Sequence, residues 1–177
     1  YVAEPRAMAR KITRRAALGA SVALLVPNAA TAGPIYVPLF RIERSKNANI
    51  VQYDAVLEQV DKLDPKTPVI CYWILKAEDG RREGLNALDR RAYGFKAVPE
   101  KGGSWLLYLN ATSERSIRVL RWQGRWVAQI VICGRSAVLE RIYVATDETG
   151  LIPKVRYIDL HGADMENGKR LTERLRP

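Results

Sequence analysis

Residues 116–133 read SIRVLRWQGRWVAQIVIC, which is two apolar runs separated by a short polar turn. The runs at 116–122 and 126–133 are rich in β-branched and aromatic residues, which favours strands. Gln123, Gly124 and Arg125 between them predict a tight hairpin. This stretch therefore predicts antiparallel β-structure in this part of the chain.

Short strand-like runs recur along the rest of the sequence, at 35–42, 50–57, 68–75, 104–110, 138–146 and 154–161. The first two flank a polar turn at 45–49, where Asn47 and Asn49 tolerate turn geometry. The pair Asn167-Gly168 predicts a type I′ turn that joins the strand around 155–160 to a last strand at 169–174. A C-terminal helix is the alternative for that last segment.

One segment has a different period. Within 82–95, Leu85, Leu88 and Ala92 recur at helical spacing, and Gly94 offers a stop. The whole pattern, about eight or nine strands and one helix, predicts a mainly β (α+β) fold. We expect an antiparallel β-sandwich or open barrel with the helix packed on it. No repeat or linker interrupts 33–177, so we expect a single domain there.

The first 32 residues have the layout of an export signal that follows a short extension. From Met8, a basic segment that includes Arg14 and Arg15 leads into an apolar stretch at 16–26, then Pro27 and the small residues 30–32. This order is typical of a secretory signal, with cleavage after Ala32. The arginine pair resembles a twin-arginine signal, although the general secretory route stays open. The sequence therefore predicts a periplasmic or secreted protein.

Export also explains much of the positive charge. The chain carries 29 Lys and Arg against 19 Asp and Glu, a net charge of +10. Residues 1–32 contribute +4 of this, which leaves +6 for 33–177. A basic balance often indicates nucleic acid or an anionic surface as a partner. For an exported domain we expect an anionic ligand or envelope component, and nucleic acid is disfavoured.

The single His and the two Cys restrict the chemistry that the chain can carry. The usual zinc ligand sets cannot be built without carboxylates. Asp159, His161 and Asp164 lie close in sequence, but Asp164 falls near a turn, so we expect no metal and no cofactor. Cys71 and Cys133 both fall within strand runs, where they form either a disulfide after export or two separately buried thiols.

Most signatures of catalysis are absent from the sequence. It contains no G-x-S-x-G elbow, H-E-x-x-H motif, Walker A loop or Rossmann glycine pattern. A cysteine nucleophile with His161 as its base is disfavoured because both thiols are expected to be buried. A non-enzymatic function is therefore favoured.

The densest polar cluster lies at 41–49. Alternation along a strand places Arg41 and Glu43 on one face and Arg44 on the other. The residues expected to contact an anionic ligand are Arg41, Arg44, Lys46 and Asn47, because guanidinium, ammonium and amide groups bind phosphate and carboxylate well. The alternative is a solvated hairpin whose charges pair with one another.

A second basic group interleaves arginines with two tryptophans: Arg115, Arg118, Arg121, Trp122, Arg125 and Trp126. This composition is found in platforms for single-stranded nucleic acid. For an exported protein, an anionic envelope polymer or a lipid headgroup is a better target. The simpler interpretation is that Trp122 and Trp126 pack as a cross-strand aromatic pair.

Several strings of residues resemble an uncharacterised exported bacterial family, the domain-of-unknown-function family 4833. They are FRIERSKNAN at 40–49, VQYD at 51–54, Tyr72-Trp73, AYGF at 92–95, and 155–162 together with Gly168 and Glu173. The resemblance spans nearly all of 33–177. It implies export and a shared fold but no activity.

We therefore expect a non-enzymatic binding domain for an anionic small molecule or envelope component. One alternative is a small periplasmic hydrolase in which His161, Asp159 and Glu173 converge on a cleft. A second is a structural envelope protein without a ligand, which would have a filled core and flat surfaces. No membrane-spanning segment is expected in 33–177, because no apolar run there is long enough.

Overall fold

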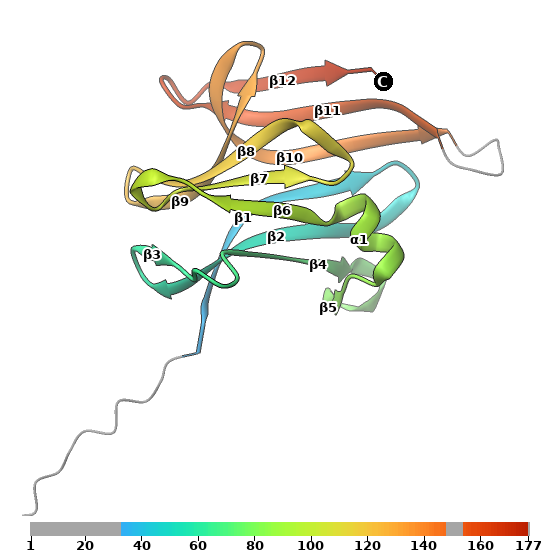
Figure 1. Cartoon of the computed structure of the whole chain (residues 1–177). Coiled ribbons are helices and arrows are strands. Elements are labelled where there is room, and N and C mark those ends of the chain that lie inside the picture. Colours follow the sequence, from blue (N-terminus) through green and yellow to red (C-terminus); the bar gives the residue numbers. More distant parts are fainter. Residues whose placement is uncertain (1–32, 148–153, 177) are drawn as a thin grey trace, which may run out of the picture. The chain divides into compact units, whose positions relative to one another are not determined.

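The computed structural model of the chain describes residues 33–147 and 154–176, which form twelve strands and one α-helix (Figure 1). The strands are β1 (Ile35–Arg44), β2 (Asn47–Gln59), β3 (Lys62–Leu63), β4 (Val69–Leu75), β5 (Arg81–Gly84), β6 (Phe95–Pro99), β7 (Trp105–Leu109), β8 (Thr112–Trp122), β9 (Arg125–Ile132), β10 (Arg135–Asp147), β11 (Lys154–Asp164) and β12 (Arg170–Leu175). The helix is α1 (Ala87–Tyr93). The expected export signal lies outside the described residues. None of the described helices is long and apolar enough to cross a membrane.

The sheet branches at β10. Along one side of β10, β11 pairs antiparallel from Ala137 to Asp147. Along the other side β9 pairs antiparallel with residues 135–138, and β1 then pairs parallel with residues 141–144. The sheet order is therefore β5-β4-β2-β1-β10-β9-β8-β7-β6, with β11 and β12 added at β10. Every other strand pair among the described residues is antiparallel.

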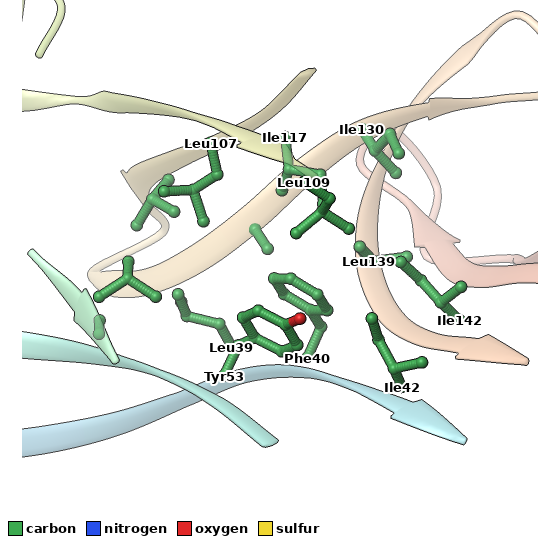
Figure 2. Close-up of a cluster of buried hydrophobic side chains, with 14 of the residues drawn as sticks. Leu39, Phe40, Ile42, Tyr53, Leu107, Leu109, Ile117, Ile130, Leu139 and Ile142 are labelled. Atoms are coloured by element: carbon green, nitrogen blue, oxygen red, sulfur yellow. The ribbon is translucent and has the colours of Figure 1, made fainter. Parts of the chain in front are cut away.

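The two arms of the sheet on either side of β10, β1-β2-β4-β5 and β9-β8-β7-β6, curl toward each other and enclose the core. Phe40 of β1 stacks on Tyr53 of β2, with ring centroids 4.4 Å apart. Tyr53 also contacts the ring of Phe95 on β6, at the opposite end of the sheet order. Figure 2 shows Leu107, Leu109 and Ile117 facing these rings across the interior. The result is a curled, half-barrel sheet, which confirms the predicted β-sandwich or open barrel.

Two tight hairpins have the backbone conformation that a type I′ turn requires. Gln123 and Gly124 have φ of 47° and 76°, which confirms the predicted turn between β8 and β9. Cys133 and Gly134, with φ of 50° and 75°, make a second such turn between β9 and β10. Cys133 is therefore an exposed turn residue, and its prediction as a buried strand residue is wrong.

The two tryptophans beside the first hairpin do not form the predicted cross-strand pair. The pairs are instead Trp122 with Arg125 and Arg121 with Trp126. Partners in a ladder share a face and successive residues alternate, so the two indoles lie on opposite faces of the hairpin. Trp126 is buried in the core and only 8% exposed.

The two predicted Asn turns differ from expectation. Between β1 and β2 the turn is only Ser45-Lys46, and the residue with positive φ is Lys46, at 61°. Between β11 and β12, among the described residues of the turn, only Gly168 has positive φ, so the turn is not type I′. It is a longer loop in which the amide of Gly168 donates to the carbonyl of Asp164. The predicted last strand at 169–174 is confirmed as β12.

The helix is shorter than predicted, because residues 81–84 form strand β5 beside β4. Asn86 caps α1, and its side chain accepts from the amide of Asp89. Leu88, expected on the buried face, is 73% exposed, whereas Tyr93 is buried. Gly94 ends the helix in an extended conformation. A side chain there would lie 2.3 Å from the carbonyl oxygen of Arg90, so glycine is required by space and not by positive φ.

Candidate functional site: a basic cavity at the branch point

A row of polar side chains crosses the outer face of five strands at one level. The register aligns Gln52 of β2 with Arg41 of β1, Arg41 with Arg141 of β10, Arg141 with His161 of β11, and His161 with Thr172 of β12. Residues paired in a ladder share a face of the sheet. Positions far apart in sequence therefore meet on one surface.

Two bulges open this row into a cavity. The β1–β2 register shifts at Leu39, and the β10–β11 register shifts at Glu140. Both bulged residues line a cavity of about 440 Å³, beside the point where β1 begins to pair with β10. Bulges re-aim side chains and are frequent next to functional sites. The other lining residues are Pro38, Phe40, Arg41, Gln52, Arg141, His161 and Arg170.

A chain of hydrogen bonds fixes the polar wall of the cavity. The Nε of Arg41 donates to Oε1 of Glu43 over 2.6 Å, and Nη1 of Arg141 donates to Oε2 of the same carboxylate over 3.2 Å. The Nη2 of Arg141 lies 3.0 Å from Nε2 of His161, and Nδ1 of His161 lies 3.1 Å from Oγ1 of Thr172. Both guanidinium groups are thus held by fixed partners.

These contacts determine the protonation state of His161. A guanidinium only donates, so Nε2 of His161 must accept from Arg141 and the proton sits on Nδ1, which donates to Thr172. Burial lowers the pKa of His161 below its usual value, and the adjacent Arg141 lowers it further, against the opposing effect of Asp159. His161 is therefore neutral in the folded protein near neutral pH.

The cavity is positively charged. Three guanidinium groups line it, those of Arg41, Arg141 and Arg170, and Glu140 is the one carboxylate among the lining residues. Arg170 has no hydrogen-bond or ion-pair partner among the described residues. Burial acts to raise the pKa of Glu43, but hydrogen bonds and charges from Arg41 and Arg141 outweigh this and hold that pKa below its usual value. Glu43 is thus ionised and orients the two arginines.

The structure separates the four residues predicted to bind a ligand. Arg41 lines the cavity and contacts Glu43, as the alternation predicts. Arg44 points to the opposite face, where its Nη1 donates to the hydroxyl of Tyr93 over 3.1 Å. Lys46 lies exposed in the turn, and the side chain of Asn47 accepts from the amide of Asn49. Only Arg41 of the four belongs to the cavity.

The sequence did not single out Arg141 or Arg170 as site residues. Both lie in or beside runs expected to be strands, but an isolated arginine in a strand has no local motif. Arg141 reaches the cavity because β1 pairs with β10, one hundred residues further along the chain, and Arg170 reaches it because β12 pairs with β11, which pairs with β10. The only local signal was the polar composition of 41–49, which located one wall.

The side chains of the alternative hydrolase site do not converge. Asp159 shares a face with His161, but both of its carboxylate oxygens accept from Arg174, at 2.7 Å each. Glu173 pairs with Leu160 in the ladder and so lies on the other face. Its carboxylate binds Arg115 and accepts from the amide of Cys133. The condition that would have supported a hydrolase is therefore not met.

Neither the two cysteines nor Asp164 belongs to the cavity. Cys71 and Cys133 are both free thiols, Cys71 half-buried beside α1 and Cys133 exposed. Burial raises the pKa of Cys71 to about 11, so it is a thiol at neutral pH. Asp164 is bound by Arg135, on the face opposite to His161. Within the described parts of the chain, no group of three or more His, Cys, Asp or Glu side chains is arranged to hold a metal ion.

A comparison with models of protein families identifies the family of this chain. The model of the family described as domain of unknown function (DUF4833) matches residues 40–174. The chain belongs to the DUF4833 family. This confirms the resemblance seen in the sequence. No curated protein and no solved structure matches the chain.

The matched region of the DUF4833 domain contains most of the cavity. The match begins at Phe40, which lines the cavity from β1, and continues past Arg170, which lines it from β12. The family description assigns no activity, so the function of this domain must be argued from the geometry of its own side chains.

Proposed function

We propose that this DUF4833 domain is an exported, non-enzymatic binding protein whose cavity at the branch point takes a small anionic ligand. The observation that carries the proposal is the convergence of Arg41, Arg141 and Arg170 on one cavity, where they outnumber two carboxylates: Glu140, which lines the cavity, and Glu43, which binds Arg41 and Arg141. Guanidinium groups bind phosphate and carboxylate with two parallel hydrogen bonds, which makes three of them a strong anion site.

The size and rigidity of the cavity support a small ligand. Its volume of about 440 Å³ lies toward the low end of the range usual for small-molecule sites. Glu43 and His161 hold Arg41 and Arg141 in place before a ligand arrives. Such preorganisation reduces the entropy lost on binding. Within the described residues, His161, Asp159 and Glu173 do not converge on one cleft, which favours binding over catalysis.

Calorimetric titration with inorganic phosphate and with citrate tests the proposal. We expect Arg170→Ala and Arg141→Gln to weaken binding at least about tenfold, or 1.4 kcal/mol. Arg44→Ala and Lys46→Ala are matched controls that remove a positive charge outside the cavity, and they should leave affinity unchanged. If wild type binds neither anion, or if Arg44→Ala costs as much as Arg170→Ala, the cavity is not the site.

The proposed export rests on the order of basic, apolar and small residues in 1–32. Mass spectrometry of the protein recovered from the periplasm or medium of a bacterial host tests it. A chain that begins near Gly33 supports export with cleavage after Ala32. A chain retained in the cytoplasm with its N-terminal segment intact would refute it.

A further inference from the structure

The wall of the branch-point cavity carries hydrogen-bond acceptors as well as its guanidinium donors. One acceptor is the carboxylate of Glu140, and another is the side-chain oxygen of Gln52, since both residues line the cavity. A fully ionised oxyanion such as sulfate can only accept hydrogen bonds, so it could not bond to either of these groups. The acceptors therefore restrict which anions fit the cavity.

Glu140 has no fixed partner of its own. It is the bulged residue at which the register between β10 and β11 shifts. Among the described residues its carboxylate makes no hydrogen bond and no ion pair, because the neighbouring Arg141 is bound to Glu43 and His161 instead. The charge of Glu140 thus opposes any anion that has no proton to donate to it.

The amide of Gln52 is oriented so that its oxygen is left over. Its Nε2 lies 3.2 Å from the carbonyl oxygen of Phe40, 3.0 Å from that of Tyr53 and 3.0 Å from Oδ1 of Asp54. Three acceptors around one atom require that atom to be the nitrogen, since an amide oxygen cannot donate. The oxygen Oε1 has no partner within the described parts of the chain, so it remains an acceptor for a ligand.

A buried carboxylate holds the amide in this orientation. Asp54 is only 2% exposed, and its Oδ2 accepts from the hydroxyl of Tyr72 over 2.6 Å. Burial and this hydrogen bond raise the pKa of Tyr72 to about 12, so the hydroxyl keeps its proton at neutral pH. Rotation of the Gln52 amide would bring its oxygen against Oδ1 of Asp54, two acceptors facing each other. The acceptor on the wall is therefore fixed before a ligand arrives.

We infer that the ligand of this cavity is an oxyanion that carries a hydroxyl group. Its charged oxygens bind the three guanidinium groups, and its hydroxyl donates to Glu140, the stronger acceptor because it is charged. Gln52 adds a second acceptor to the wall. This inference rests on the proposed anion site and adds a selection to it. A site built to hydrogen-bond a hydroxyl rejects the analogue that lacks it, because the polar groups of the site are then left unpaired.

Calorimetric titration with two matched pairs of anions tests the inference. Phosphate and sulfate are similar in size and, at pH 8, in charge, but only phosphate keeps a proton on oxygen. Citrate and tricarballylate carry the same carboxylates, and only citrate has a hydroxyl. At constant ionic strength, we expect wild type to bind phosphate or citrate at least about tenfold more tightly than its partner without the hydroxyl. A preference in the first pair indicates a phosphate, and one in the second pair a hydroxy acid.

Glu140→Gln removes the charge that opposes a fully ionised anion. Glu140 is exposed, so this variant should fold like wild type. We expect it to bind the partner without the hydroxyl more tightly than wild type does, and its preference for the hydroxyl to fall to about threefold or less. Glu78→Gln is the matched control, because it removes the same charge from an exposed side chain that does not line the cavity. It should keep the preference of wild type.

The outcomes separate this inference from the proposed function. If wild type binds neither phosphate nor citrate, the anion site itself is wrong and the inference falls with it. If all four anions bind alike and Arg170→Ala weakens each of them, the anion site stands and the inference is overturned. A preference that is unchanged in Glu140→Gln, or equally reduced in Glu78→Gln, overturns it as well.

Discussion

Adjacent positions on β1, β10 and β11 point to opposite faces of the sheet, and the two faces differ in polarity: the inner face is apolar and the outer face is polar. On the inner face, Ile42, Ile142 and Leu160 align and are buried in the core. One residue away on the outer face, Arg41, Arg141 and His161 align around the cavity. The difference indicates that stability depends on the inner face, whereas the proposed ligand binding depends on the outer face, so the two can be changed separately.

Of the variants that test this comparison, Gly162→Ala on the inner face is expected to have the largest effect, which is a loss of stability. A Cβ at Gly162 would lie 2.4 Å from the carbonyl oxygen of Val138 and 3.0 Å from Cδ1 of Ile132. We expect the free energy of unfolding to fall by about 3 kcal/mol, because neither the strand backbone nor a packed core yields easily. Urea denaturation measures this loss.

Gly84→Ala is the control for crowding. No atom lies within 4 Å of a Cβ at that position, and Gly84 has no positive φ. Its stability should stay within about 0.5 kcal/mol of wild type. Equal effects at Gly162 and Gly84 would contradict the crowding inferred for β11.

A smaller loss on the inner face is expected from Tyr53→Phe. The hydroxyl of Tyr53 is fully buried and donates to the carbonyl of Tyr93 over 2.5 Å, which attaches α1 to the sheet. Among the described residues, its removal leaves that carbonyl with only a long contact to the Cys71 thiol, so we expect a loss of about 2 kcal/mol. Tyr36→Phe, at a half-exposed ring, should cost nothing measurable in the same urea titration.

The outer face should make stability depend on pH through His161. Its pKa is lowered in the folded state from the usual 6.5, so below that pH the unfolded chain binds a proton that the folded chain does not. Stability therefore decreases as the pH falls from about 6.5 toward the lower folded pKa. Urea titrations at pH 7.5 and 5.5 measure the decrease.

His161→Gln should reduce this loss between pH 7.5 and 5.5, since glutamine has no proton to gain and still accepts from Arg141. Asp159 has its pKa lowered by hydrogen bonds from Arg174, so its own contribution to stability is lost only at more acidic pH. An unchanged pH dependence in His161→Gln would show that His161 is not the group responsible.

The smallest effect on stability is expected from Arg170→Ala. The side chain is exposed and unpaired within the described residues, so unfolding should change by less than about 0.5 kcal/mol. Phosphate affinity should nevertheless fall in the calorimetric titration described above. A large loss of stability would show that the two faces are not separable.

Most strands could be predicted from the sequence because their signals are local. The Gln123-Gly124 turn and the run at 138–146 lie where the structure places a hairpin and β10. The short strands β3, β5 and β6 were missed. Residues 81–84, for example, are all exposed, so β5 has no apolar alternation to detect. Gly94 was correctly predicted as a stop, and the structure gives the physical reason, which is crowding against the carbonyl of Arg90.

The site was only partly predictable because alternation tells which residues share a face but not which strand lies beside them. Arg41 and Glu43 were correctly placed together, and Arg44 apart. Arg141, Arg170 and the bulge at Glu140 depend on pairings between distant segments. The bulges add one residue to a strand without any mark in composition, so the cavity could not be inferred from the sequence.

The parallel pairing of β1 with β10 has a consequence for how the protein folds. Hairpins such as β8–β9 close over a few residues, whereas residues 41 and 141 must meet across a hundred-residue loop. Closing so long a loop costs more entropy and slows folding, so this pairing is expected to form after the hairpins. The cavity exists only once β1 has joined β10. A chain in which this pairing fails would keep its hairpins but lack the cavity, and the proposed anion binding would thus report the completion of folding.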